Sequence, residues 1–127
     1  MAIILDTNAL SAFADGQASL RDALESEIDL ALPVIVLGEY LYGVRQSRHR
    51  ARYEDWLKAH LPAFVILEIE KETASRYAEL RSELKAVGRP IPSNDVWIAA
   101  LARQHGCRVV TRDRHFEAVR GLRLLYW

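Results

Sequence analysis

The chain has 127 residues, a length typical of one compact domain; 50% of them are hydrophobic and 27% are charged. Lysine and arginine number 17, as do aspartate and glutamate, so the net charge of zero neither favours nor excludes a nucleic-acid partner. The one cysteine, Cys107, cannot form an internal disulfide, and the apolar run Ala2–Leu5 is too short for a signal peptide or a membrane span. We expect one domain over residues 1–127 in the cytoplasm, with Cys107 as a small buried residue.

The first part of the chain alternates short apolar runs with helical patterns. Ala2–Leu5 is uninterrupted and apolar, as buried parallel strands are, and the three residues after it (Asp6, Thr7, Asn8) favour helix N-termini. The patterns that follow predict a helix to about Phe13, a second helix over Ala18–Ser26 and a short strand over Asp29–Leu32.

The pattern of residues 33–46 is compatible with either a strand or a helix. The run Val34–Leu37 has strand propensity, but apolar residues recur at helical spacing through Leu41 and Val44, and Pro33 suits a first helical position. We predict a helix here, because the run is long and no turn signal divides it.

The rest of the chain continues the alternation. The predicted elements are a basic amphipathic helix over Arg48–His60, a strand over Phe64–Leu67, a helix over Lys71–Val87, a stiff loop over residues 88–92, a helix capped by Ser93 or Asn94 and ending near Gly106, a strand over Arg108–Thr111, a turn or short helix over Thr111–Phe116, and a strand over Leu122–Leu125. Strands that alternate with helices imply right-handed crossovers. We therefore predict an α/β fold of three layers, with helices on both faces of a mainly parallel central sheet.

Four acidic residues, far apart in the chain, fall where a parallel sheet gathers side chains. Asp6 is the first residue after the first strand, and Asp113 comes two residues after the strand over 108–111 ends. Asp95 lies in the first turn of a helix whose preceding loop returns to the same edge, and Glu39 projects from an otherwise apolar helix. Because ligands bind beyond the carboxyl ends of the strands in such sheets, we expect these acids to converge there.

A group of carboxylates without interleaved lysine or arginine repels itself and is costly to bury. A bound divalent cation removes that cost. Ligand atoms that are all oxygen suit Mg²⁺ or Mn²⁺, whereas zinc calls for cysteine and histidine. A cation held by carboxylates can activate water near neutral pH and stabilise charge on a phosphate, and this chemistry needs no histidine base.

Each acid also has a purely structural explanation. Asp6 can cap the following helix, Asp95 is favoured near a helix N-terminus by the helix dipole, and Asp113 can be an ordinary turn residue. Glu39 fits such an explanation least, because its neighbours are mostly apolar. The functional interpretation depends on the four acids as a set.

Each of the four acids lies in a short motif. The motifs are Ile4-Leu5-Asp6-Thr7-Asn8, Leu37-Gly38-Glu39-Tyr40-Leu41-Tyr42-Gly43-Val44, Asn94-Asp95-Val96-Trp97-Ile98-Ala99-Ala100 and Val110-Thr111-Arg112-Asp113-Arg114-His115-Phe116. In this order and at these spacings, over essentially the whole chain, they resemble the PIN-domain nucleases and, within them, the VapC-type toxins of bacterial and archaeal toxin–antitoxin pairs. No acid of the family pattern is missing.

The resemblance implies a PIN-like domain in which the four acids coordinate one or two Mg²⁺ or Mn²⁺ ions. A metal-activated water would then attack an RNA phosphodiester and leave 5′-phosphate and 3′-hydroxyl ends. It also assigns to Asn8 and Thr111 the support of the acids by hydrogen bonds, with capping or turn formation as the alternative for both. As partners it implies a second copy of the chain and an antitoxin whose C-terminal segment lies in a groove over the active site.

Basic residues near these motifs are candidate RNA contacts. Arg112 and Arg114 flank Asp113, and we interpret them as backbone contacts, which would be sequence-independent and sensitive to salt. For the basic stretch over residues 45–52, RNA contact and a solvated helix face both stay open. His115 could assist the leaving group, although a surface-turn histidine is the commoner case.

Other functions fit parts of the pattern. An aspartyl phosphatase or phospho-acceptor domain also carries an aspartate after a strand, but Asn8 stands where such phosphatases have a second acid. A PIN-like module that grips RNA without cleaving it would not need four intact acids. A PIN nuclease that processes RNA or acts on DNA outside any toxin pair is the alternative within the nuclease interpretation.

Overall fold

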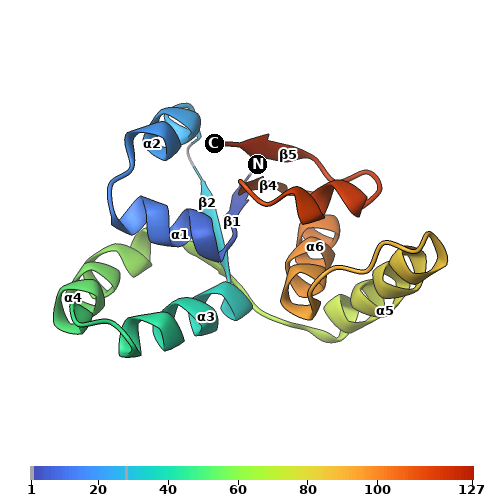
Figure 1. The fold of residues 1–127 in the computed structure, drawn as a ribbon, viewed down its shortest axis with the longest axis horizontal. Coiled ribbons are helices and arrows are strands. Elements are labelled where there is room, and N and C mark those ends of the chain that lie inside the picture. Colours follow the sequence, from blue (N-terminus) through green and yellow to red (C-terminus); the bar gives the residue numbers. More distant parts are fainter. Residues whose placement is uncertain (1, 28) are drawn as a thin grey trace.

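The computed structural model of the protein describes residues 2–27 and 29–127, and its centre is a five-stranded sheet in the order β3-β2-β1-β4-β5 (Figure 1). The strands are β1 (Ile3–Leu5), β2 (Leu30–Pro33), β3 (Val65–Leu67), β4 (Arg108–Thr111) and β5 (Leu124–Tyr126). Every pairing between neighbouring strands is parallel, so the predicted α/β fold with a parallel sheet is confirmed.

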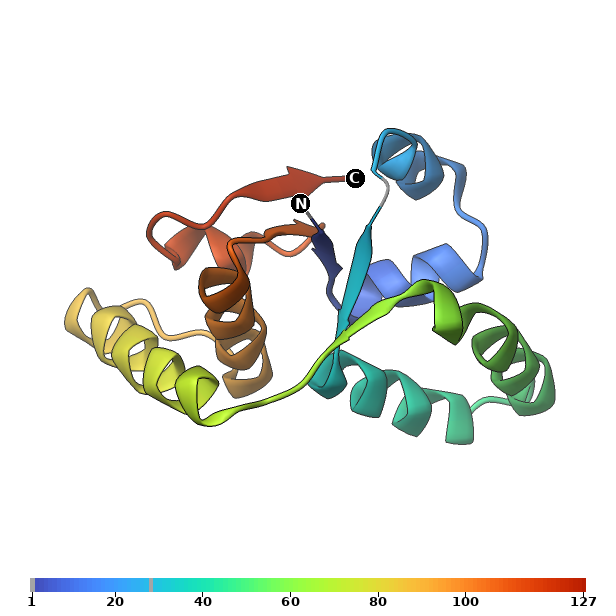
Figure 2. The same ribbon diagram turned by 180° about the vertical axis from the view of Figure 1, so that it is seen from behind.

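Helices cover both faces of the sheet. They are α1 (Thr7–Ala14), α2 (Ala18–Leu24), α3 (Val34–Arg45), α4 (Arg50–His60), α5 (Lys71–Ala86) and α6 (Ser93–His105), with short 3-10 helices η1 (Leu61–Ala63) and η2 (Arg114–Ala118). Helices α1 to α4 lie on one side of the sheet, and α5 and α6 lie on the other (Figures 1 and 2). The chain crosses the sheet from β1 to β3 and then returns to β4 and β5, and right-handed crossovers in opposite directions place their helices on opposite faces.

Two predicted helix starts are wrong in detail. Pro33 is the last residue of β2 and not the first of α3, because its backbone is extended, with ψ at 141°. At α6 the cap position is held by Pro92, not by Ser93 or Asn94; its extended backbone turns the chain, and its carbonyl accepts the N–H of Val96 at 3.1 Å. The helix over residues 33–46 is itself confirmed, as is the end of α6 at a glycine.

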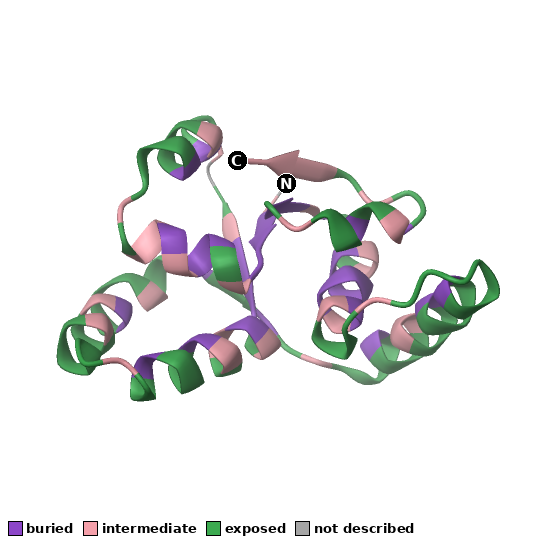
Figure 3. Ribbon diagram, in the orientation of Figure 1, coloured by how far each residue is buried: buried purple, intermediate pink, exposed green. Residues whose placement is uncertain are grey.

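The core lies between the two helical layers, along the strands coloured purple in Figure 3. The side chains of Ile3–Leu5 in β1 and of Val109 and Val110 in β4 are fully buried. Burying one such side chain stabilises the fold by about 1.5–3 kcal/mol. Cys107 is buried as predicted, and Trp127 packs against the core beside β5. Among the described residues, no helix has the length and apolar character needed to cross a membrane.

Strands β1 and β4 form the switch point of the sheet. They are neighbours, yet the chain leaves β1 toward β2 on one side and leaves β4 toward β5 on the other. Leu5 pairs with Val110, so the next residues along each strand, Asp6 and Thr111, lie side by side. In parallel sheets the crevice at such a point is the usual position of a ligand.

Candidate active site

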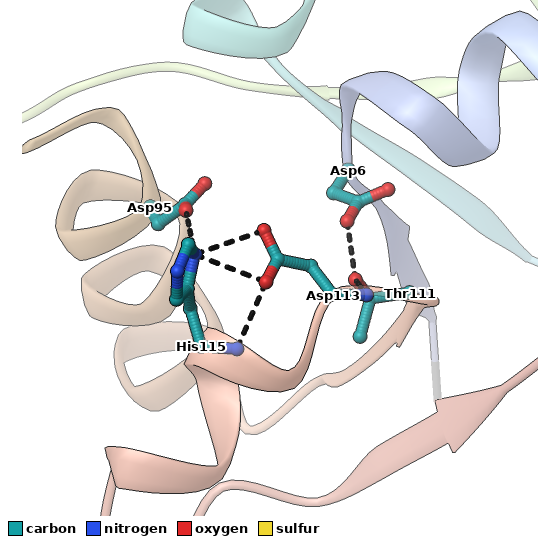
Figure 4. A network of polar contacts seen from close by, with 5 residues as sticks. All are labelled: Asp6, Asp95, Thr111, Asp113 and His115. Atoms are coloured by element: carbon teal, nitrogen blue, oxygen red, sulfur yellow. Dashed lines mark hydrogen bonds and ion pairs between the residues drawn. The ribbon is translucent and has the colours of Figure 1, made fainter. Parts of the chain in front are cut away.

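Asp6 occupies the centre of the switch point and is only 4% exposed. One carboxylate oxygen accepts the backbone N–H of Ala9 at 2.9 Å, which caps α1, and the other accepts the hydroxyl of Thr111 (Figure 4). Burial raises the pKa of Asp6, and the nearby carboxylates of Asp113 and Glu39 add to that rise, while its two hydrogen bonds oppose it. The same side chain therefore caps a helix and faces other acids.

Thr111 joins two of the acids. Its side chain is fully buried; the hydroxyl donates to Asp6 and accepts the backbone N–H of Asp113 at 2.9 Å. A contact of this kind fixes the orientation of a carboxylate. The supporting role that the family resemblance implies for Thr111 stays a prediction.

Asp113 follows β4 and caps the short helix η2. It accepts the backbone N–H of His115 at 2.8 Å, and Nδ1 of the same histidine lies 3.0 Å from Oδ1 of Asp113 and 3.8 Å from Oδ2 of Asp95. Ligand atoms of Asp95, Asp113 and His115 all lie within 4.8 Å of one another (Figure 4). His115 is thus exposed, as predicted, but it lies in η2 and also belongs to the acidic cluster, although it was not among the metal ligands expected from the sequence.

Asp95 reaches the cluster from the first turn of α6, in the opposite helical layer to Glu39. Burial, followed by the charges of Asp113 and Asp6, raises its pKa to about 6, and His115 partly offsets this rise. Carboxyl groups with raised pKa values are typical of functional sites, because charge has been concentrated there without neutralisation.

Glu39 is held by a residue that the sequence analysis did not single out. The hydroxyl of Thr7, the first residue of α1, donates to Oε1 of Glu39 at 2.8 Å. The motif held a signal for this contact. Thr7 directly follows Asp6, so its hydroxyl lies at the start of α1, the helix that packs against α3. Asn8 is exposed, and the hydrogen bonds of the described residues include none from its side chain to the four acids.

The acidic cluster has the composition of a divalent-cation site. Across residues 2–27 and 29–127, no lysine or arginine nitrogen lies within 4.0 Å of the carboxylates of Asp6, Glu39, Asp95 or Asp113. The donors are carboxylate oxygens with one imidazole, a set that suits Mg²⁺ or Mn²⁺. Burial and, after it, repulsion within this set raise the pKa values of Asp6 and Asp95, and a bound cation would relieve the repulsion.

The two arginines beside Asp113 rest on aromatic rings near the end of the chain. The guanidinium of Arg112 lies 3.8 Å from the ring centre of Trp127, and that of Arg114 lies 4.3 Å from the ring centre of Tyr126. Arg114 also pairs with Glu117 at 2.7 Å. Both arginines are exposed next to a candidate metal ligand.

A groove of about 280 Å³ extends from Glu39 between α1, α3 and α4. Its lining is formed by Thr7, Ser11, Asp15, Glu39, Tyr40, Gly43, Val44, Ser47 and Tyr53. The Tyr40 hydroxyl is buried without a hydrogen-bond partner among the described residues, and burial raises its pKa to about 12. The arginines of the basic stretch over residues 45–52 are exposed, and Arg50 among them pairs with Glu54.

The sequence and the fold both match known proteins. The PIN domain family model matches residues 3–122. Ribonuclease VapC2 of Rickettsia felis is 30% identical, with 100% of this chain and 98% of that protein covered. The tRNA(fMet)-specific endonuclease VapC of Shigella flexneri is 29% identical, with 98% and 96% covered. In the crystal structure of VapBC2 from Rickettsia felis bound to promoter DNA, one chain superposes with a TM-score of 0.90 at 29% identity, over 100% of this chain and 99% of that one.

These matches confirm the resemblance that the four motifs predicted. Because the sequence match covers nearly the whole chain and the fold agrees over its full length, the protein belongs to the PIN domain family, and the two relatives described above are VapC nucleases.

Proposed function

We propose that the protein is a divalent-metal-dependent endoribonuclease and the toxin of a toxin–antitoxin pair. The observation that carries this proposal is the gathering of four carboxylates at one edge of the sheet, with no neutralising lysine or arginine among the described residues. The ribonuclease and endonuclease names of its relatives support RNA as the substrate. Because strands from both ends of the chain share one sheet, residues 1–127 act as one catalytic domain.

Asp6, Glu39, Asp95 and Asp113 would hold one or two Mg²⁺ or Mn²⁺ ions, with His115 in reach of the same position. When bound, such an ion supplies an activated water and neutralises charge that develops on the phosphate. The protein's own contribution is to fix the carboxylates in advance. Asp6 is held by its two hydrogen bonds. Asp113 is held by the N–H of His115, which its carboxylate accepts, and by its own N–H, which donates to the Thr111 hydroxyl.

Two threonines support two of the acids. The Thr111 hydroxyl donates to Asp6 and would orient it, and the Thr7 hydroxyl does the same for Glu39. Residues in such supporting positions commonly contribute roughly 10- to 100-fold to metal affinity or activity. A supporting role for Asn8 stays a prediction.

Arg112 and Arg114 are the proposed RNA contacts beside the cleaved bond. Each guanidinium is supported by an aromatic ring and remains exposed toward solvent next to Asp113. Such contacts follow the phosphate backbone and carry no sequence information themselves.

The surface supports two protein partners. The groove at Glu39 would receive a segment of an antitoxin, and the superposable Rickettsia felis chain is a member of a VapBC2 complex.

The exposed apolar residues Val34 and Leu41 lie two turns apart on one face of α3, which would pair with a second copy of the chain. We place the protein in the cytoplasm, where it would meet both RNA and an antitoxin.

The test is to incubate the purified protein with total cellular RNA in Mg²⁺, in Mn²⁺ or in EDTA, and to map new 5′-phosphate ends by sequencing. We expect discrete ends that require metal. Asp95→Asn should lower cleavage by more than about 100-fold, because even residues that only support metal ligands contribute roughly 10- to 100-fold.

Asp55→Asn, which changes an exposed carboxylate of α4, is the matched control and should cleave normally. If folded, metal-loaded protein produces no new ends in RNA, the ribonuclease proposal is wrong. Cleavage of DNA alone, or RNA binding that Asp95→Asn leaves unchanged or strengthens, would then identify the activity that replaces it.

A further inference from the structure

A second hollow adjoins the acidic cluster on the side opposite the Glu39 groove. It has a volume of about 390 Å³ and is lined by the loop over residues 88–91, by Asp113, Arg114 and His115, and by Ala118. The loop precedes α6, so it belongs to the helical layer that faces away from α3. The hollow and the Glu39 groove are therefore the two flanking depressions over which a strand bound at the acids can continue.

The two flanking depressions differ in charge. The Glu39 groove carries two carboxylates, Asp15 and Glu39, and no lysine or arginine in its described lining. The hollow carries two arginines, Arg89 and Arg114, beside the candidate metal ligand Asp113. An RNA phosphate is repelled by the first arrangement and attracted by the second.

Arg89 is fixed at its backbone and free at its side chain. The preceding Gly88 has a φ of +67°, a left-handed conformation that favours glycine, and it ends α5. The N–H of Arg89 donates to the carbonyl of Leu84 at 3.0 Å, and Pro90 restricts the conformation of the residue before it. No carboxylate oxygen within the described chain lies within 4.0 Å of the Arg89 guanidinium.

Arg114 is oriented but partly neutralised. Its guanidinium lies over the ring of Tyr126, and both its Nη1 and the Tyr126 hydroxyl donate to Oε1 of Glu117. The side chain is nevertheless 73% exposed. Glu117 forms an ion pair with Arg114, whereas it interacts with Arg89 only at a distance beyond 4.0 Å, so Arg89 is the less neutralised of the two arginines in the hollow.

We propose that this hollow binds the RNA nucleotide next to the cleaved bond, with Arg89 contacting its phosphate and Arg114 forming the opposite wall. The inference rests on the proposed function, because it assigns a further part of the same substrate. The volume agrees with this occupant, since pockets for small ligands measure roughly 300–1,000 Å³.

The experiment measures binding without cleavage. Protein carrying Asp6→Asn is titrated, in EDTA, against a short fluorescein-labelled single-stranded RNA of random sequence, and fluorescence anisotropy is followed at several salt concentrations. Adding Arg89→Ala should weaken binding about tenfold and reduce the slope of log affinity against log salt by about 0.7, as expected for one lost phosphate contact on a single strand. Arg89→Lys should restore most of the affinity, because it keeps the charge.

Lys58→Ala is the control for loss of one positive charge. Lys58 is exposed on α4, shortly before β3, which forms the opposite edge of the sheet. Replacing it should change the RNA affinity by less than about twofold. If Arg89→Ala matches Lys58→Ala while the parent protein binds RNA, the subsite is wrong and the proposed function stands. If the parent protein binds no RNA and the wild type cleaves none, the proposed function fails, and this inference fails with it.

Discussion

Asp6 and Thr111 form the pair on which the geometry of the site depends. Both side chains are buried, so water cannot take the place of either hydrogen-bond partner. Their hydrogen bond joins positions 105 residues apart in the chain. The threonine hydroxyl donates to one acid and accepts from the backbone of another, so it needs both an oxygen and a proton at one place. Valine, which has the same shape, supplies neither.

We therefore expect Thr111→Val to reduce RNA cleavage by roughly 10- to 100-fold and to weaken the affinity for Mn²⁺, because Asp6 loses its orienting donor. Thr111→Ser keeps the hydroxyl and should stay close to wild type. Cleavage rates at saturating and limiting Mn²⁺ separate an effect on metal binding from an effect on the reaction. Equal activity of the valine and serine variants would show that the hydroxyl has no part in positioning Asp6.

The raised pKa values make the metal-free protein sensitive to pH. The pKa of Asp95 is raised to about 6, and that of Asp6 is also raised. Protonation therefore favours the folded state. The stability that these groups contribute is complete below the ordinary aspartate pKa of about 4 and is lost as the pH rises through about 6.

In EDTA, the melting temperature should accordingly fall between pH 5 and pH 7.5, as followed by circular dichroism. Asp95→Asn removes one of the responsible charges and should flatten this part of the profile, whereas Asp55→Asn should leave it as it is. A metal-free protein whose melting temperature rises over the same interval, with no difference between wild type and Asp95→Asn, would contradict the expectation.

At the scale of the elements, most of the secondary structure could be predicted, because the deciding signals are local. Apolar runs of three or four residues identified the buried strands, and the glycine after α6 identified its end. The helix over residues 33–46 could be predicted despite its strand-like start, since its periodicity outlasts that start. Helix starts were less predictable, because Pro33 and Pro92 occupy the cap positions through their extended backbones and have no side-chain oxygen to accept a backbone N–H, which is the signal that identifies a cap from the sequence.

The end of α6 gives a test at this scale. Gly106 has a φ of +64°, so Gly106→Ala should lower the free energy of unfolding by about 1–2 kcal/mol through strain in the left-handed region. Gly43→Ala in α3 is the matched change: its new methyl group meets no atom within 4 Å, and helix propensity should add up to roughly 1 kcal/mol. Urea denaturation measures both, and the two changes should have opposite signs.

The candidate site was less predictable than the elements. The four acids could be found because each lies in a recognisable motif and a parallel sheet brings strand ends together. The hydrogen bond from Thr7 to Glu39 depends on the packing of α1 against α3, and the position of His115 depends on the turn η2, so neither follows from local pattern. The hollow at Arg89 combines a loop and a turn separated by more than twenty residues, and only the folded chain shows it.

At the scale of the whole molecule, a cation would act as a tie between the two helical layers. Glu39 comes from the layer of α1 to α4, and Asp95 comes from the layer of α5 and α6, with Asp6 and Asp113 between them. A ligand that binds the folded state alone raises its stability, by about 2.7 kcal/mol when its concentration is a hundred times the dissociation constant.

Mn²⁺ or Mg²⁺ should therefore raise the melting temperature of the EDTA-treated protein, and more at pH 7.5 than at pH 5, because protons compete with the ion for Asp95. Asp95→Asn should lose most of this effect. Exchange into the same buffer without added metal should leave the melting temperature unchanged. An equal rise in wild type and Asp95→Asn would mean that the ion binds elsewhere.

The order of the strands has a consequence for biosynthesis. In the sheet, β4 lies directly beside β1, yet more than a hundred residues of chain separate Asp6 from its partner Thr111. A nascent chain can assemble β1, β2 and β3 early, but it lacks Thr111 and Asp113 until those residues have emerged from the ribosome. Under the proposed function, a partly synthesised chain that stops before β4 would be catalytically incomplete, so the RNA of the translation machinery would not be exposed to an active site before β4 has joined β1.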